Sequence, residues 1–245
     1  MFEKRDIVAA PDVLGKPSLS AKIESVQQFA LFAGVSPTDS AAIISVSHEK
    51  RLYPRQNLFS AGDAVDPVFL VLSGSVKITQ TGFSGGEVIL RVCGVGDLVG
   101  MFGLWPDDKH NSSAQAAHAG TALVWDSATF AKLLDQFVRL RHNTFRVLEE
   151  RLQEMEQRFR ELSTYDVQTR LSCELIRLSK RFGCGVTENG EIHLSQTDLA
   201  QLTGTTMPTV SRLLGHWEKL GIVSVRREAV QIRNFAALTQ LSQSE

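Results

Sequence analysis

Residues 206–212 bring three hydroxyl side chains and one arginine within two turns of a potential helix. Hydroxyl groups such as those of Thr206, Thr209 and the nearby Ser195 suit phosphate oxygens, and an arginine can form a bidentate contact with guanine. Arg212 is therefore the candidate for reading a base edge. The pattern predicts contact with duplex DNA through Ser195, Gln196, Thr206, Met207, Pro208, Thr209, Ser211, Arg212, Arg226 and Arg227.

Two short helices with a tight turn must position these side chains. Ser195 and Asp198 have the spacing of a capping box, which starts the first helix. Ala200 is small where two helices cross closely, Gly204 supplies the turn, and Val210 buries the second helix against the first. These offsets are typical of a helix-turn-helix.

The second helix and the segment after it complete the unit. Thr206 is the expected cap, and Pro208 is tolerated because the N–H groups of a first turn lack intrahelical partners. Residues 222–232 form two β-type runs around a turn, as in a wing. Arg226 and Arg227 at its tip are expected to reach phosphates. The alternative is a helical hairpin that binds no nucleic acid.

A long helical segment is predicted from residue 127 to about 165. Its apolar residues recur at intervals of three and four, and its flanks are rich in Arg and Glu, which is typical of a two-stranded coiled coil. The alternative is a single helix packed on its own domain. The predicted dimer contacts are Phe145, Leu148, Leu152, Met155, Phe159 and Leu162.

Residues 51–126 contain short β-type runs between glycine turns, among them 68–72 and 76–79 on either side of Ser73-Gly74. Many short strands at regular spacing indicate a β-roll or jelly roll. Further on, Asp166 is a predicted helix cap, and Asn189-Gly190 predicts a hairpin within 184–194. We expect an α+β chain with four parts: an arm over 1–25, a β-roll sensor domain over 26–130, a dimerisation helix over 131–165 and a winged helix-turn-helix over 166–245.

Composition limits the function. The 245 residues suit two domains, and the net charge of −1 requires DNA contacts to come from placement rather than bulk charge. Three widely separated cysteines disfavour a disulfide framework or a metal site. With no apolar stretch of about 20 residues and no signal-like start, we expect a cytoplasmic protein without membrane contact.

In this order the elements resemble those of the catabolite-activator and fumarate-nitrate regulator (CRP/FNR) superfamily, over residues 26 to about 235. The resemblance rests on Leu31-Phe32, Gly62-Asp63, Gly74-Ser75-Val76, Gly96-Asp97 followed by Gly100, and Thr209-Val210-Ser211-Arg212. It implies a transcription regulator rather than an enzyme. It also implies a homodimer on the long helix, palindromic promoter DNA, RNA polymerase as a further partner and an effector that turns the DNA-binding domains into register.

Two departures from the family pattern matter. Cyclic-nucleotide-binding members carry a Glu shortly after the glycine of the phosphate cassette and an Arg about ten residues later that pairs with the cyclic phosphate. Here Met101 and Phe102 follow Gly100, and Asn111 takes the arginine position. We therefore expect no binding of cAMP or cGMP. In the second helix Pro208 replaces a common Glu, so the half-site should differ at that base pair.

The expected effector is thus an unknown small molecule, gas or redox signal. The predicted effector pocket comprises Met101, Leu104, Asn111, Ser112, Leu152 and Met155. One alternative is a haem-based gas sensor, with iron held by Cys93, Met101, His110 or His118. Another is a regulator that binds DNA constitutively and whose roll serves only as a dimerisation scaffold and a contact surface for RNA polymerase.

Overall fold

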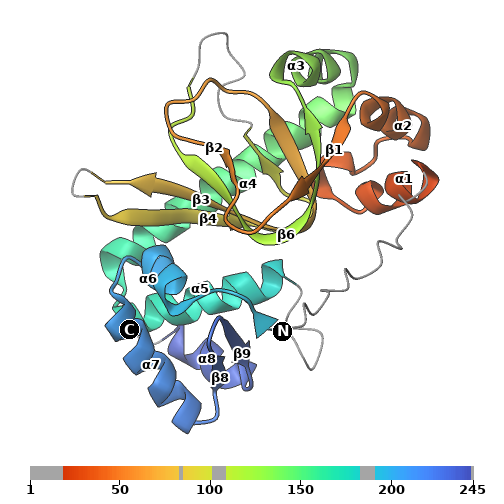
Figure 1. Ribbon diagram of the computed structural model, residues 1–245. Helices are drawn as coiled ribbons and strands as arrows, with labels where there is room; N and C mark the ends of the chain where they lie inside the picture. Colours follow the sequence, from red (N-terminus) through yellow and green to blue (C-terminus); the bar gives the residue numbers. More distant parts are fainter. Residues whose placement is uncertain (1–18, 83–84, 101–108, 183–190, 244–245) are drawn as a thin grey trace, which may run out of the picture.

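The structure, a computed structural model, describes residues 19–82, 85–100, 109–182 and 191–243. A β-domain with flanking helices lies above a smaller, mainly helical domain, and one long helix runs behind the sheet (Figure 1). None of the described helices is both long and apolar enough to cross a membrane. The predicted arm over 1–25 lies mostly outside the described residues, and α1 begins inside it, at Leu19.

The first domain is built on an antiparallel sheet in the order β1-β6-β3-β4, with β2 paired to β6 and β5 paired to β3. This is the expected β-roll in an α+β fold. Its strands are β1 His48–Leu52, β2 Asn57–Phe59, β3 Val68–Thr81, β4 Glu87–Cys93, β5 Leu98–Val99 and β6 Ser113–Trp125. Its flanking helices are α1 Leu19–Gln27, η1 Ala30–Phe32, α2 Pro37–Ser45 and α3 Ser127–Gln136.

The prediction of a turn at Ser73-Gly74 is wrong. β3 runs through both residues as one strand of 14 residues, and its register with β6 shifts there, as in a β-bulge. Gly74 has φ +78°, and a Cβ at Gly120 would lie 1.9 Å from the Ser73 carbonyl oxygen. The glycines therefore mark close strand contact and not a chain reversal.

The predicted helical segment from 127 to 165 is also interrupted. Asp126 caps α3 by accepting a hydrogen bond from the Thr129 N–H at 2.7 Å, and the helix ends before Phe137. The long helix α4 Val138–Thr164 then begins in a new direction. The extended backbone of Phe137 separates the two helices, and its side chain packs on the core of the roll.

The second domain contains α5 Val167–Arg181, β7 Glu191–Ile192, α6 Gln196–Thr203, α7 Met207–Lys219, β8 Val223–Arg226, β9 Ala229–Ile232 and α8 Phe235–Leu241. Asp166 caps α5 as predicted, accepting from the Thr169 N–H at 2.8 Å. Most of the predicted hairpin over 184–194 lies outside the described residues. Its last part, β7, pairs with β9 to give the sheet order β7-β9-β8.

The hydrophobic core of the second domain continues into the first. Ile89 and Val92 of β4 belong to the same buried cluster as Leu199, Leu202 and Trp217. The Lys77 ammonium group lies 2.8 Å from Asp198 of α6, and Gln201 donates to Glu87 at 3.3 Å. The DNA-facing unit predicted from the sequence is thus docked on the edge of the roll, with α6 beside β4 (Figure 1).

The contact at Gly120 predicts a large effect of one methyl group. We expect Gly120→Ala to lower the stability of the roll by about 1–3 kcal/mol or more, because the strand backbones must move apart. Gly215→Ala in α7 is the control: its Cβ meets nothing within 4 Å, and helix propensity favours alanine by about 1 kcal/mol. Thermal unfolding of both variants tests this, and an unchanged midpoint for Gly120→Ala would contradict the close contact.

Candidate DNA interface and effector cavity

The helix-turn-helix forms through local capping. The Asp198 N–H donates to Ser195 Oγ at 3.1 Å, and the Ser195 N–H donates to the Asp198 carboxylate at 3.1 Å, which completes the predicted capping box. Gly204 ends α6 in the left-handed region at φ +61°. Ala200 and Val210 are buried between α6 and α7, as expected. The turn therefore fixes how α7 is presented.

The first turns of α7 are open to solvent. Met207 is 48% exposed, and Pro208, Ser211 and Arg212 are also exposed. The Arg212 guanidinium makes no hydrogen bond or ion pair with any described residue. These predicted contact residues share one accessible helix end, which has the width and side chains to enter a major groove.

Thr206 was predicted to cap the second helix, and the structure bears this out only for its position. It occupies the N-cap position of α7, but its side chain makes no capping bond to the backbone of the helix. Its hydroxyl instead lies 3.0 Å from the Thr209 hydroxyl. Thr206 is exposed and Thr209 half-buried, so the paired hydroxyls stay at the rim of the α7 surface.

Ser195 and Gln196 lie at the start of α6, close to the roll. Both are half-buried, and the Ser195 hydroxyl donates to Asp198 at 2.9 Å. Asp198 also binds Lys77 of the roll, so the start of α6 faces β3 in this arrangement. The prediction that Ser195 and Gln196 contact DNA therefore requires the roll to leave this helix end accessible.

The predicted wing is formed by β8 and β9. Val223 pairs with Ile232 at one end of this ladder, and Arg226 pairs with Ala229 at the other. Arg226 is exposed at the tip, but its guanidinium lies 2.6 Å from Glu191. Arg227 is exposed in the turn and forms no ion pair with a described residue. The wing thus carries one shared charge and one charge available for a phosphate.

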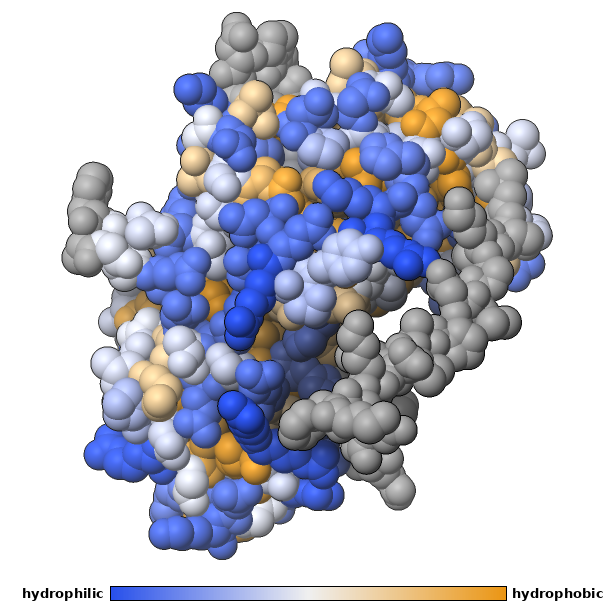
Figure 2. Space-filling view, viewed as in Figure 1, coloured by the Kyte–Doolittle hydropathy of each residue, from blue (hydrophilic) through white to orange (hydrophobic). Residues whose placement is uncertain are grey.

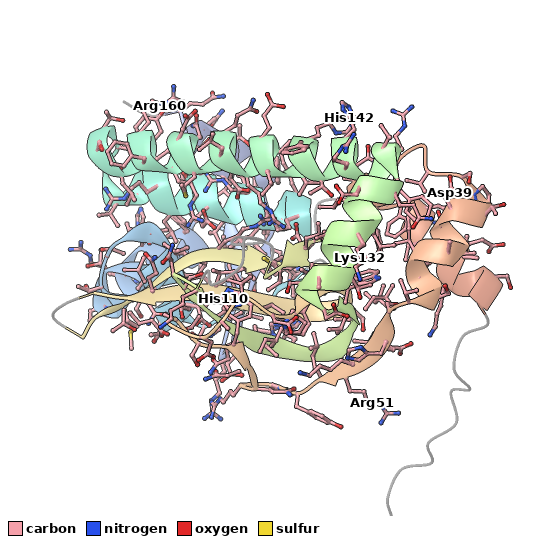
Figure 3. All side chains as sticks on the ribbon, turned by 90° about the horizontal axis from the view of Figure 1, so that it is seen from above. Asp39, Arg51, His110, Lys132, His142 and Arg160 are labelled. Carbon is pink, nitrogen blue, oxygen red and sulfur yellow. The ribbon has the colours of Figure 1, made fainter. Side chains whose placement is uncertain are left out.

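The predicted apolar stripe on α4 faces outward. Five of its members, Phe145, Leu152, Met155, Phe159 and Leu162, are between 49% and 73% exposed. Leu148 is different, because it is half-buried and packs on the core of the roll. His142 and Arg160 project from the outer side of α4, away from the sheet (Figure 3). By contrast, the opposite face of the molecule is mostly hydrophilic, with small separate apolar areas (Figure 2).

A cavity of about 670 Å³ lies between the sheet and α4. Four of the predicted effector-pocket residues line it, namely Asn111, Ser112, Leu152 and Met155, while Met101 and Leu104 lie outside the described residues. The sequence prediction missed the charged lining. That lining comprises Arg91, Lys109, Arg151, Glu154 and Arg158.

Of the predicted haem ligands, Cys93 and His110 line this cavity. Burial lowers the pKa of His110, which leaves the ring neutral, and its buried Nε2 has no partner among the described residues. Burial raises the pKa of the Cys93 thiol, which disfavours the thiolate that would bind iron. His118 is not among the described lining residues and lies with Nδ1 2.7 Å from Ser75 Oγ. Met101 is outside the described residues.

A docked winged helix-turn-helix, a β-roll and a connecting helix with an exposed apolar stripe define a DNA-binding regulator. The family model of the cyclic nucleotide-binding domain matches residues 49–137, and that of the Crp-like helix-turn-helix domain matches 169–241. The chain belongs to the CRP/FNR superfamily of transcription regulators. It is accordingly a regulator and not an enzyme, as expected from the sequence, and its family implies DNA binding and dimer formation.

Individual relatives of this chain support the same family assignment. The fumarate and nitrate reduction regulatory protein of Vibrio cholerae is 30% identical over 199 residues, which cover 80% of this chain and 79% of that protein. The cyclic AMP receptor protein of Thermus thermophilus is 28% identical over 86% of this chain and 96% of that protein. The structure of FixK2 from Bradyrhizobium japonicum matches with a TM-score of 0.71 at 19% identity, covering 82% of this chain and 99% of that one, which shows the shared fold.

The two arginines of the wing differ in their ion pairing, so we expect their substitution to affect DNA binding differently. Arg227→Ala should weaken binding to all DNA sequences alike and reduce the slope of log affinity against log salt by about one per subunit. Arg226→Ala should change the slope less, because Glu191 already shares its charge. Salt titrations on specific and random duplexes measure this, and equal slopes for wild type and Arg227→Ala would count against a phosphate contact.

Proposed function

We propose that this protein is a homodimeric regulator that binds palindromic promoter sites and is gated by an effector other than cAMP. The observation that carries the proposal is the exposed apolar stripe on α4, on the same chain as an exposed recognition helix. Two copies joined along α4 would carry two α7 helices related by a two-fold axis. Such symmetry suits a palindrome whose half-sites are about one helical turn apart.

The stripe is suited to a second copy of the same helix. Its spacing of three and four matches a two-stranded coiled coil, and Arg146 and Glu150 on its flank form an ion pair at 3.6 Å within one helix. Removing five large apolar side chains from water would supply a substantial free energy of association. An exposed stripe of this length is uncommon on a monomer in isolation.

Dimerisation can be tested at Phe159, the most exposed member of the stripe. Phe159→Glu places a charge, and its symmetry mate, in the proposed interface and should shift the protein to monomer in sedimentation at micromolar concentration. Gln153→Glu is the matched control, since it adds the same charge on an exposed flank of α4 and should leave the mass unchanged. A monomeric wild type would refute the proposal.

Sequence-specific binding depends on Arg212. Arg212→Ala should cost about 1–3 kcal/mol in binding to the specific site and relax one position of each half-site, because a bidentate base contact is lost. Lys219→Ala at the far end of the same helix is the control and should change binding little. Equal losses on specific and random DNA for Arg212→Ala would contradict its role as the base reader.

The residue at the arginine position of the phosphate cassette argues against a cyclic nucleotide as the effector. Asn111 lacks the cation that pairs with a cyclic phosphate in nucleotide-binding members, and its carbonyl accepts a hydrogen bond from Gln80 at 2.9 Å. Haem is the second candidate, favoured by the unpartnered Nε2 of His110 in the cavity. RNA polymerase is proposed as the partner through which the DNA-bound dimer acts.

Two measurements separate the alternatives. An absorbance spectrum of the protein as isolated should lack a Soret band if the effector is not haem, and a band lost in His110→Ala would favour the gas sensor instead. Promoter binding without any added ligand should be weak for a gated regulator. Tight binding by the ligand-free protein would support the constitutive alternative.

A further inference from the structure

The cavity between the sheet and α4 has an excess of positive charge. Among its described lining residues are four cations, Arg91, Lys109, Arg151 and Arg158, against one carboxylate, Glu154. Glu154 is already bound to Arg181 of α5 at 2.7 Å. Like charges gathered in a partly enclosed space repel one another and attract a counter-ion.

Arg151 lacks a carboxylate partner. Its side chain donates to the Leu98 carbonyl oxygen, its Nε is buried without an acceptor, and no described carboxylate lies within ion-pair distance. Burial, together with the neighbouring Arg91, lowers the pKa of Arg151 to about 10, so that it stays charged at neutral pH. A buried charge without a partner is costly unless something else in the site balances it.

Arg91 is a second cation among the residues that line this cavity. Its Nη2 binds Asp97 at 2.5 Å, whereas its Nε is buried and has no acceptor among the described residues. Arg91 comes from β4 and Arg151 from α4, and both residues line the cavity. A carboxylate, sulfonate or phosphate between them would accept from both.

Much of the remaining lining is apolar, beside the polar residues Gln80, His110, Asn111 and Ser112. Ile78, Leu98 and Val99 contribute from the sheet, and Leu148 and Leu152 contribute from α4. A fully inorganic anion would leave these side chains against water or empty space. The lining therefore suits a ligand with a charged end and an apolar body.

We propose that this cavity binds an amphipathic organic anion, with its charged group between Arg91 and Arg151 and its body against the apolar wall. Asn111, at the position where cyclic-nucleotide binders hold phosphate, lines the same cavity, but the proposal places the charged group at Arg91 and Arg151 instead. The inference rests on the proposed function in taking this cavity as the effector site. It adds the chemical class of the effector and the two residues that select it.

Arg158 gives such a ligand a route to the DNA-binding domain. It lines the cavity, donates to the Leu90 carbonyl oxygen of β4 at 2.5 Å and donates to the Leu202 carbonyl oxygen of α6 at 3.0 Å. An anion that attracts this guanidinium competes with the Leu202 carbonyl and with Glu174, which lies 3.7 Å from it. Ligand binding would then change how α6 is held against the roll.

Two fluorescent dyes of nearly the same shape test the charge selection. 8-Anilino-1-naphthalenesulfonate carries an anionic group, and N-phenyl-1-naphthylamine is its neutral counterpart. With the full-length protein, Arg151→Gln should weaken binding of the sulfonate by about tenfold or more while changing that of the neutral dye less than twofold. Arg146→Gln, on an exposed flank of the same helix, is the control and should affect neither dye.

The outcomes separate clearly. Equal losses of both dyes, or a sulfonate affinity unaffected by Arg151→Gln, would overturn the proposal. Should Arg151→Gln fail to fold, Arg91→Gln takes its place with the same expectation.

Octanoate should displace the sulfonate dye and inorganic phosphate should not, and the reverse result would overturn the requirement for an apolar body. Because no DNA is present, failure here leaves dimerisation and promoter binding to be judged by their own measurements.

Discussion

Buried ion pairs between α4 and α5 fix the direction in which the DNA-binding domain leaves the roll. Arg177 of α5 donates to both oxygens of Glu161 on α4, at 2.7 and 2.8 Å, and also binds Glu174. Arg158 of α4 approaches Glu174 at 3.7 Å. Glu161 and Glu174 are almost fully buried. Such a network adds little net stability, but breaking it leaves uncompensated charge, so it favours one angle between the helices over others.

Because of this constraint, α4 connects three structural features of the molecule. It carries the exposed apolar stripe, it lines the cavity, with Leu152 and Met155 belonging to both, and its last turns contact the DNA-binding domain. Leu162 illustrates the convergence, because it belongs to the stripe and also lies against Gly204, the turn of the helix-turn-helix. A change in the cavity or along the stripe would therefore act on the same helix that contacts the turn of the helix-turn-helix.

The docking of α6 on the roll is held by contacts of modest individual strength. Lys77 and Asp198 are partly exposed and so are screened by solvent, and Gln201 reaches Glu87 at 3.3 Å. The apolar contribution of Ile89 and Val92 is larger, since both are buried with the core of the second domain. Such docking is stable, yet a small ligand that binds the docked and undocked states with different affinity could still shift the equilibrium between them.

The sequence by itself determined the features that depend on neighbouring residues. The capping box at Ser195, the left-handed turn at Gly204, the wing and the apolar stripe all follow from spacings of a few residues, where backbone geometry alone decides which groups meet. Only the tertiary structure decided the rest. Lys77 meets Asp198 across 121 positions, and Ser73 meets Gly120 across a strand pair that was predicted to end in a turn. Likewise, Arg91 and Arg151 share a cavity because β4 and α4 pack together, and no local pattern encodes which distant side chains such packing leaves without a partner.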